Sequence, residues 1–131
     1  MDVTLGPWTA DMSVAETQRK PLAEAMGNEA WNTVKNAAGF TPKEAPQGKP
    51  AKSGFTISGK LTNVLKDGGS IRVMSKFTLW VDGTFSNVAP LDGQGSAQDG
   101  ATAEDVLRAI TESRVKKLLE AVKTGRATKA R

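Results

Sequence analysis

The residue types that carry most enzyme chemistry are missing from this chain. Its 131 residues include no histidine, no cysteine and no tyrosine, which excludes Ser-His and Cys-His catalysis, imidazole or thiolate metal sites, and disulfides. The carboxylates are scattered, and no pair has a spacing that would force both into one apolar pocket, the usual environment of a general acid. Gly93 and Gly95 resemble part of a phosphate-binding loop but lack its third glycine. We therefore expect no enzymatic activity, no cofactor and no metal.

Four side chains remain as candidates for binding, and they are Lys60, Arg72, Lys76 and Trp80. They lie in segments where apolar and polar residues alternate, which predicts strands with one buried and one solvated face. With a three-residue hairpin loop at 67–69, Lys60 would lie opposite Lys76. The same register puts Thr56 opposite Trp80 and Val64 opposite Arg72. This face either keeps the sheet hydrated or binds an anionic or protein partner.

Two apolar alternations define the strands that carry these side chains. The first consists of Phe55, Ile57, Gly59, Leu61 and Leu65, and the second of Ile71, Val73, Phe77, Leu79 and Val81. Both predict half-buried antiparallel strands whose odd-numbered residues face the core. A short strand with Val3 and Leu5 precedes them and stops at Gly6-Pro7. Asp82-Gly83 indicates a further hairpin, followed by a weaker strand over residues 85–91 that Pro90 interrupts.

Helical periodicity occurs twice. The second helix has Thr102 as N-cap, an acidic first turn with Asp105, and Gly125 after its end. Its apolar stripe comprises Leu107, Ile110, Val115, Leu118, Leu119 and Val122. The first helix has two possible starts, a capping box from Ser13 to Glu16 or a first turn that contains Pro21, and both versions end at Gly39. We interpret Trp8 and Trp31, which fall in this first region, as packing residues and not as a site.

The element order β-α-β-β-β-α predicts an α+β fold, a two-layer sandwich with two helices on one face of a mainly antiparallel sheet. The length is that of one domain, which we place at residues 1–125. Residues 41–54 contain three prolines, two glycines and three lysines, which predicts a mobile loop. The stretch 92–100 is typical of a polar, glycine-rich connector, and residues 126–131 of a disordered basic tail.

The net charge of +4 comes entirely from the end of the chain. Residues 1–100 carry ten acidic and ten basic side chains, whereas residues 101–131 carry four acidic and eight basic ones. This excess could attract an acidic partner but is also common on solvated helix ends. No apolar run approaches the roughly 20 residues needed to cross a bilayer. The opening MDVTLGPWTADM contains no targeting signal.

Several segments together resemble bacterial envelope proteins. These are the helix PLAEAMGNEAWNTVKNAAGF, the strands SGFTISGKLTNV and IRVMSKFTLWVD, and the closing helix AEDVLRAITESRVKKLLEAV. Their order is similar to that in the N-terminal domain of the Tol-Pal propeller protein, in curli-secretion lipoproteins and in penicillin-binding-protein activator lipoproteins. The resemblance covers about residues 3–123 and consists of fold-level patterns, so it transfers no site residue. This chain lacks the lipobox cysteine of lipoproteins.

The resemblance implies a non-enzymatic accessory domain, periplasmic or outer-membrane-associated, that binds another envelope protein. That localisation assumes a signal removed upstream, and a native start at Met1 would favour the cytoplasm. One alternative is a nucleic-acid-binding module that uses the basic sheet face and the helix end. Another is a structural subunit of a secretion or phage-tail assembly, joined to its neighbour by strand pairing. The oligomeric state stays open.

Overall fold

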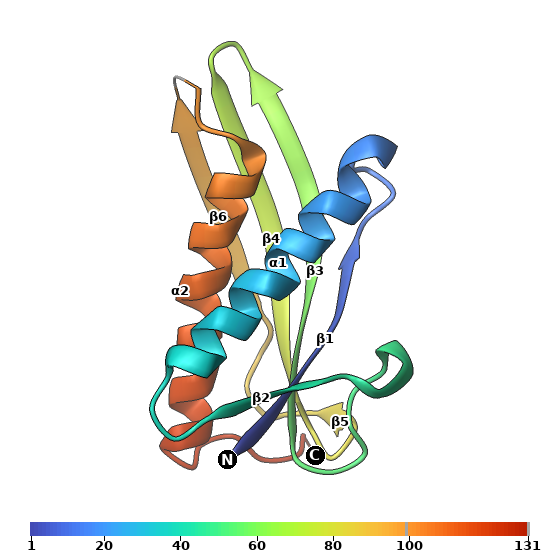
Figure 1. The fold of residues 1–131 in the computed structure, drawn as a ribbon, viewed down its shortest axis with the longest axis vertical. Helices are drawn as coiled ribbons and strands as arrows, with labels where there is room; N and C mark the ends of the chain where they lie inside the picture. Colours follow the sequence, from blue (N-terminus) through green and yellow to red (C-terminus); the bar gives the residue numbers. More distant parts are fainter. Residues whose placement is uncertain (99, 131) are drawn as a thin grey trace.

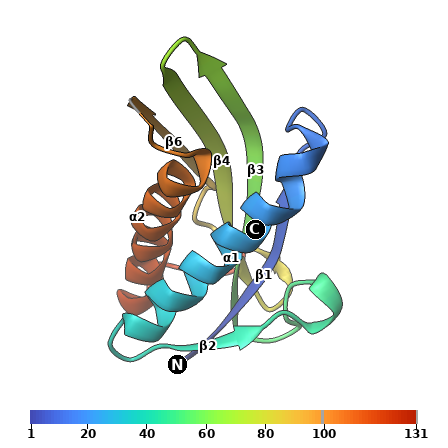
Figure 2. The same cartoon turned by 45° about the horizontal axis from the view of Figure 1, so that its top comes forward.

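Two helices lie side by side on one face of a six-stranded sheet in the computed structural model, which describes residues 1–98 and 100–130 (Figure 1). The strands are β1 (Asp2–Ala10), β2 (Thr41–Glu44), β3 (Phe55–Asp67), β4 (Ser70–Val81), β5 (Thr84–Phe85) and β6 (Leu91–Gln98). The helices are α1 (Glu16–Asn36) and α2 (Ala103–Lys123), and a short 3-10 turn η1 covers Pro46–Gly48. The predicted α+β two-layer sandwich is confirmed (Figure 2).

The sheet is mixed in strand direction. Its order is β2-β1-β3-β4-β5, and β6 also pairs with β4. Strand β1 runs parallel to β2 and β3, and α1 supplies the crossover that parallel strands need. The pairs of β4 with β3, β5 and β6 are antiparallel. Helix α1 packs on β1, and α2 packs on β4 and β6. Neither helix is long and apolar enough to span a membrane.

The core lies between the helices and the odd-numbered residues of the central strands, as predicted. The fully buried strand residues are Ile57, Leu61, Val73, Phe77 and Leu79. They meet fully buried side chains of the two helices, among them Met26, Val34, Leu107, Val115 and Leu118. In contrast, Lys60 and Lys76 on the even-numbered face are exposed. We call this second face, made of the even-numbered residues of β4 and their partners on β3, β5 and β6, the outer face.

The β3–β4 hairpin has a two-residue turn, so the predicted three-residue loop is wrong. Asp67 pairs with Ser70 around Gly68 and Gly69. The predicted register holds from Phe55 to Leu61 and then shifts by one residue between Leu61 and Asn63. A bulge there compensates for the shorter turn, because one extra residue restores the agreement between the two apolar alternations.

The bulge also moves Leu65 from its predicted place in the core to the outer face. Beyond the bulge Val64 pairs with Val73 and packs against the core. Leu65 instead pairs with Arg72, and 45% of its surface is exposed. The predicted pairing of Val64 with Arg72 is therefore wrong. One inserted residue reverses the face of every side chain that follows it.

Residues 91–98 form strand β6, where the sequence predicts a flexible connector. Helix α2 lies so close to this strand that a Cβ atom at Gly93 would approach Ile110 Cγ2 to 2.2 Å. A Cβ at Gly95 would approach Val106 Cγ1 to 3.1 Å. These glycines thus leave room for the helix. The strand predicted over 85–91 is limited to β5, and Pro90 precedes β6.

Both helices occur where the sequence predicts them. At the start of α2, Thr102 Oγ1 accepts from the Asp105 N–H, and the Asp105 carboxylate accepts from the Thr102 N–H, each at 3.2 Å. Gly125 follows the helix with φ +74°. Helix α1 has the earlier of its two predicted starts, so Pro21 lies inside it. The Ser13 hydroxyl does not cap this helix but donates to the Thr62 carbonyl at 2.8 Å.

Two segments predicted to be unstructured pair with strands. Residues 41–44 form β2 beside β1. Near the chain end, the Ala130 N–H donates to the Phe85 carbonyl of β5 at 2.9 Å, and Ala127 is buried. These pairings join distant parts of the chain and leave no local periodicity in the sequence. Arg131, the last residue of the predicted tail, lies outside the described residues.

Hydrogen exchange tests how mobile these two segments are. We expect the amides of Thr41 and Ala130 to exchange at least about tenfold more slowly than those of Lys52 and Ser53. The Thr41 N–H donates to the Met1 carbonyl and the Ala130 N–H to the Phe85 carbonyl, each at 2.9 Å. Equally fast exchange at all four amides, measured by NMR, would instead support mobility throughout both segments.

Candidate functional site

The four predicted binding residues all lie on the outer face of the sheet. Lys60 pairs directly with Lys76, as predicted, and Asp92 of β6 pairs with Lys76 from the other side. The two lysines repel each other across the strands, and the neighbouring carboxylate offsets part of that repulsion. Arg72 and Trp80 lie toward opposite ends of β4. They are eight residue steps apart along the strand, about 26 Å, a span that suits a macromolecular partner better than a small ligand.

Trp80 is held by contacts within the chain. Its ring stacks on Phe85, with centroids 4.4 Å apart and planes inclined by 20°. Its Nε1–H donates to Ser58 Oγ at 2.8 Å. Trp80 is half-buried, whereas Phe85 is 57% exposed, so Phe85 is the aromatic ring that a partner would meet. The position of Phe85 beside Trp80 could have been predicted from the turn signal Asp82-Gly83, because a two-residue turn places Phe85 opposite Trp80.

Apolar and basic side chains alternate along the outer face. Leu65 and Arg72 form a pair at the hairpin end, and the half-buried Met74 follows on the same face. The lysine pair occupies the middle of the face, and Phe85 lies at its far end. Leu65 was missed as a surface residue because the bulge that exposes it has no signature in the residue types.

The basic residues of α2 lie in the other layer of the sandwich. On α2, Arg108 forms ion pairs with Glu104 at 3.4 Å and with Glu29 of α1 at 4.0 Å. Arg114 Nε donates to the Asp92 carbonyl at 2.9 Å. These groups and the outer-face lysines therefore do not form one continuous basic track.

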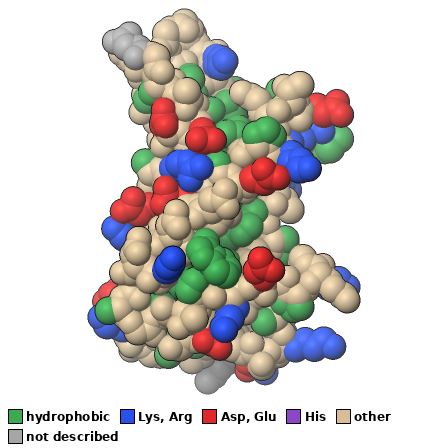
Figure 3. All heavy atoms as spheres, viewed as in Figure 1, with side chains coloured by type: hydrophobic (Ala, Val, Ile, Leu, Met, Phe, Trp, Pro, Cys, Tyr) green, Lys and Arg blue, Asp and Glu red, His purple; other side chains and the backbone are tan. Residues whose placement is uncertain are grey.

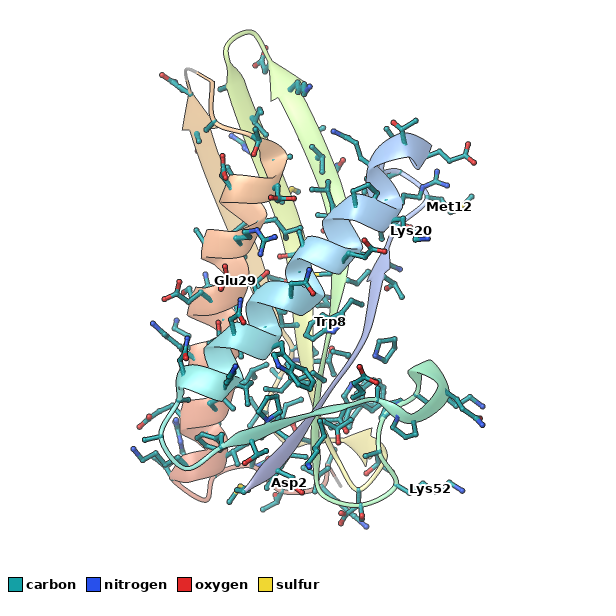
Figure 4. The ribbon with its side chains drawn as sticks, in the orientation of Figure 1. Asp2, Trp8, Met12, Lys20, Glu29 and Lys52 are labelled. Carbon is teal, nitrogen blue, oxygen red and sulfur yellow. The ribbon has the colours of Figure 1, made fainter. Side chains whose placement is uncertain are left out.

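A concave surface lies between α1, β1 and the segment after β2. We call it the tryptophan cleft, and its volume is about 660 Å³. Its lining includes Trp8 and Trp31, which the sequence identifies only as packing residues, together with Glu24, Asn28 and Glu44. Both rings pack partly against the core as well. Figure 3 shows hydrophobic side chains on this helix-bearing face, and Figure 4 labels Trp8 beside α1.

Two glycines and a bulge position Trp8 in this cleft. The pairing of β1 with β3 shifts by one residue between Leu5 and Trp8. A Cβ at Gly27 of α1 would lie 2.7 Å from Trp8 Cδ1, and a Cβ at Gly59 of β3 would lie 2.8 Å from Trp8 Cζ3. The indole therefore occupies the space that side chains at these two positions would fill. Gly27 within a helical pattern is the sequence signal that could have indicated this close approach.

Within residues 1–98 and 100–130, no three acidic side chains come close enough together to hold a metal ion. The outer face and the tryptophan cleft are two candidate places for a partner or ligand on the described residues.

Comparison with known proteins shows the fold of the chain. No protein-family model matches the sequence, and no curated protein matches it. A PelC dodecamer structure from Paraburkholderia phytofirmans has a TM-score of 0.62 at 14% identity, over 89% of this chain and 87% of that chain. A second PelC dodecamer structure has a TM-score of 0.58 at 16% identity and covers 90% of this chain and 85% of that chain. A hypothetical protein from Chlamydia trachomatis has a TM-score of 0.59 at 9% identity, over 94% of this chain and 96% of that chain.

At these identities the likeness demonstrates a shared fold. The more specific resemblance to Tol-Pal, curli-secretion and penicillin-binding-protein activator proteins stays a prediction.

Proposed function

We propose that this chain is a non-enzymatic accessory domain of the bacterial cell envelope that binds another envelope protein through its outer face. The observation that carries the proposal is a sheet with both helices on one side, whose other side exposes Leu65 and Phe85. Aromatic rings are enriched in protein interfaces, so an exposed Phe85 on a sheet face that no helix covers is a candidate contact for a protein partner. The lysine pair between Leu65 and Phe85 would guide association more than it would add affinity.

The proposed periplasmic or outer-membrane-associated location rests on the sequence resemblance to envelope proteins. Fractionation of the source bacterium provides a direct test. Recovery of the chain in the cytoplasmic fraction alone would contradict the envelope location without affecting the outer face as a binding surface.

Site-specific photo-crosslinking tests the outer face. We expect p-benzoylphenylalanine at Thr78, on the outer face between the lysine pair and Trp80, to crosslink an envelope protein in cells. The same probe at Lys117, an exposed residue of α2, should give no such product. The change Phe85→Asp should lower the Thr78 yield at least about fivefold, since a charge at an apolar contact must be desolvated. The change Met12→Asp, at a 78% exposed methionine outside this face, is the matched control.

Equal products from both probe positions, or none from Thr78, would contradict the proposal. The opposed Lys60 and Lys76 are the observation that favours the nucleic-acid alternative. This alternative predicts that the chain retards random-sequence nucleic acid in a gel-shift assay, that the binding weakens steeply as salt rises, and that it disappears when both lysines are replaced by alanine.

The partner could also be another copy of this chain, as in the structural-subunit alternative. The two PelC structures are dodecamers. Light scattering of the purified chain distinguishes a monomer that binds a different protein from a self-assembling subunit. A stable oligomer disrupted by Phe85→Asp but not by Met12→Asp would favour the subunit.

A further inference from the structure

We propose that the tryptophan cleft is a binding site for an organic cation, an ammonium or guanidinium group. The site lies in the helix-bearing part of the molecule, and the proposal is independent of any function of the outer face. Three features of the described residues carry it: the shape of the cleft, its two indole rings and its charge.

The cleft has the dimensions and the wall of a ligand site. Its volume of about 660 Å³ falls within the range of small-molecule pockets. The bulge at Gly6-Pro7 bends β1 at its wall, and Gly6 has φ +117°, a conformation that other residues rarely adopt. Bulges of this kind are over-represented beside functional sites. The Gly27 and Gly59 contacts described above fix the position of the Trp8 ring.

The charge of the lining selects the ligand class. Glu24 and Glu44 are the charged residues of the lining, and both are acidic, although the chain as a whole carries +4. Neither forms a salt bridge with a described residue. By contrast, Glu29 on the same helix is paired with Arg108. The carboxylates at the cleft thus remain available to an external cation.

The two tryptophans strengthen the same preference. A cation near an indole face is attracted by the ring quadrupole, and tryptophan is the best of the aromatic residues in this role. Trp31 lies on α1 one turn beyond Gly27 and two turns beyond Glu24, so the helix presents these positions toward one side. An anion would meet two carboxylates and no basic group of the lining. A neutral sugar could stack on indole but would gain little from the negative charge.

Indole N–H signals in a proton-nitrogen NMR spectrum test the proposal directly. The chain has three tryptophans and hence three such signals, which Trp31→Phe and Trp80→Phe would assign. On titration with choline we expect the Trp8 and Trp31 signals to move together. The Trp80 signal should stay in place, because that indole donates to Ser58 on the outer face.

Three further ligands define the chemistry. The neutral isostere 3,3-dimethylbutan-1-ol should bind at least about tenfold more weakly than choline, because it lacks the charge. N-acetyl-lysine amide distinguishes the source of the cation, since tighter binding of this compound than of choline indicates a protein side chain. Tighter binding of choline indicates a small quaternary ammonium compound. Chitobiose tests a carbohydrate site.

Matched variants test the carboxylates. The double change Glu24→Gln and Glu44→Gln should weaken choline binding at least about tenfold. The control Glu16→Gln with Glu112→Gln removes the same charge outside the cleft and should leave affinity within about twofold. Unchanged Trp80 signals verify folding of each variant. Equal binding of choline and its neutral isostere, tighter binding of chitobiose, or no movement of the Trp8 and Trp31 signals with any cation would overturn the proposal.

Discussion

Replacing Phe77 with alanine is expected to lower the free energy of unfolding by about 3–5 kcal/mol. Phe77 is fully buried between the sheet and α2, so its removal loses transfer free energy and leaves a cavity. Leu79→Ala should cost about 2–5 kcal/mol for the same reason. Lys76, the residue before Phe77, is exposed on the outer face, and Lys76→Ala should change the free energy of unfolding by less than about 0.5 kcal/mol. Urea denaturation measures all three.

The contrast between neighbours is the decisive part of this prediction. Strand residues alternate between the two faces of the sheet, so Phe77 and Leu79 face the same side and Lys76 faces the other. The two large losses in free energy of unfolding should therefore both occur at odd-numbered positions. Similar losses for Phe77→Ala and Lys76→Ala would show that β4 does not present its odd-numbered side chains to the helices.

The change Gly93→Ala is expected to destabilise the fold by about 2–3 kcal/mol. The new Cβ would lie 2.2 Å from Ile110 Cγ2 and 3.0 Å from Ser75 Oγ. Ile110 is β-branched and buried in α2, so it cannot rotate aside easily. To relieve the clash, the helix would have to move away from β6 and lose packing. Thermal or urea unfolding gives the size of the effect.

Two controls separate this clash from a general intolerance of alanine. A Cβ at Gly69, in the hairpin turn, meets no atom within 4 Å. Gly69→Ala should therefore leave the free energy of unfolding unchanged or raise it by up to about 1 kcal/mol. Combining Gly93→Ala with Ile110→Ala should cost at least about 1 kcal/mol less than the sum of the two single changes. Additive effects would mean that Gly93 and Ile110 are not in contact.

Much of the fold follows from local patterns in the sequence. The alternation around Ile57 and Phe77 predicts the central strands, and burial of both residues confirms it. The spacing of Thr102 and Asp105 predicts the capping box that starts α2. Period and cap chemistry depend on neighbours within a few residues, so the sequence alone could determine them. It also placed Lys60 opposite Lys76, because that pair lies before the bulge.

Tertiary contacts decided the rest. The bulge before Asn63, which exposes Leu65, depends on how two apolar faces fit one core. Strand β6 depends on the approach of α2 to Gly93, so a glycine that normally marks a flexible segment here allows close packing. The tryptophan cleft brings together residues of β1, α1 and the segment after β2. Each of these features results from contacts between residues far apart in sequence, and propensity and periodicity, which describe near neighbours, carry no information about them.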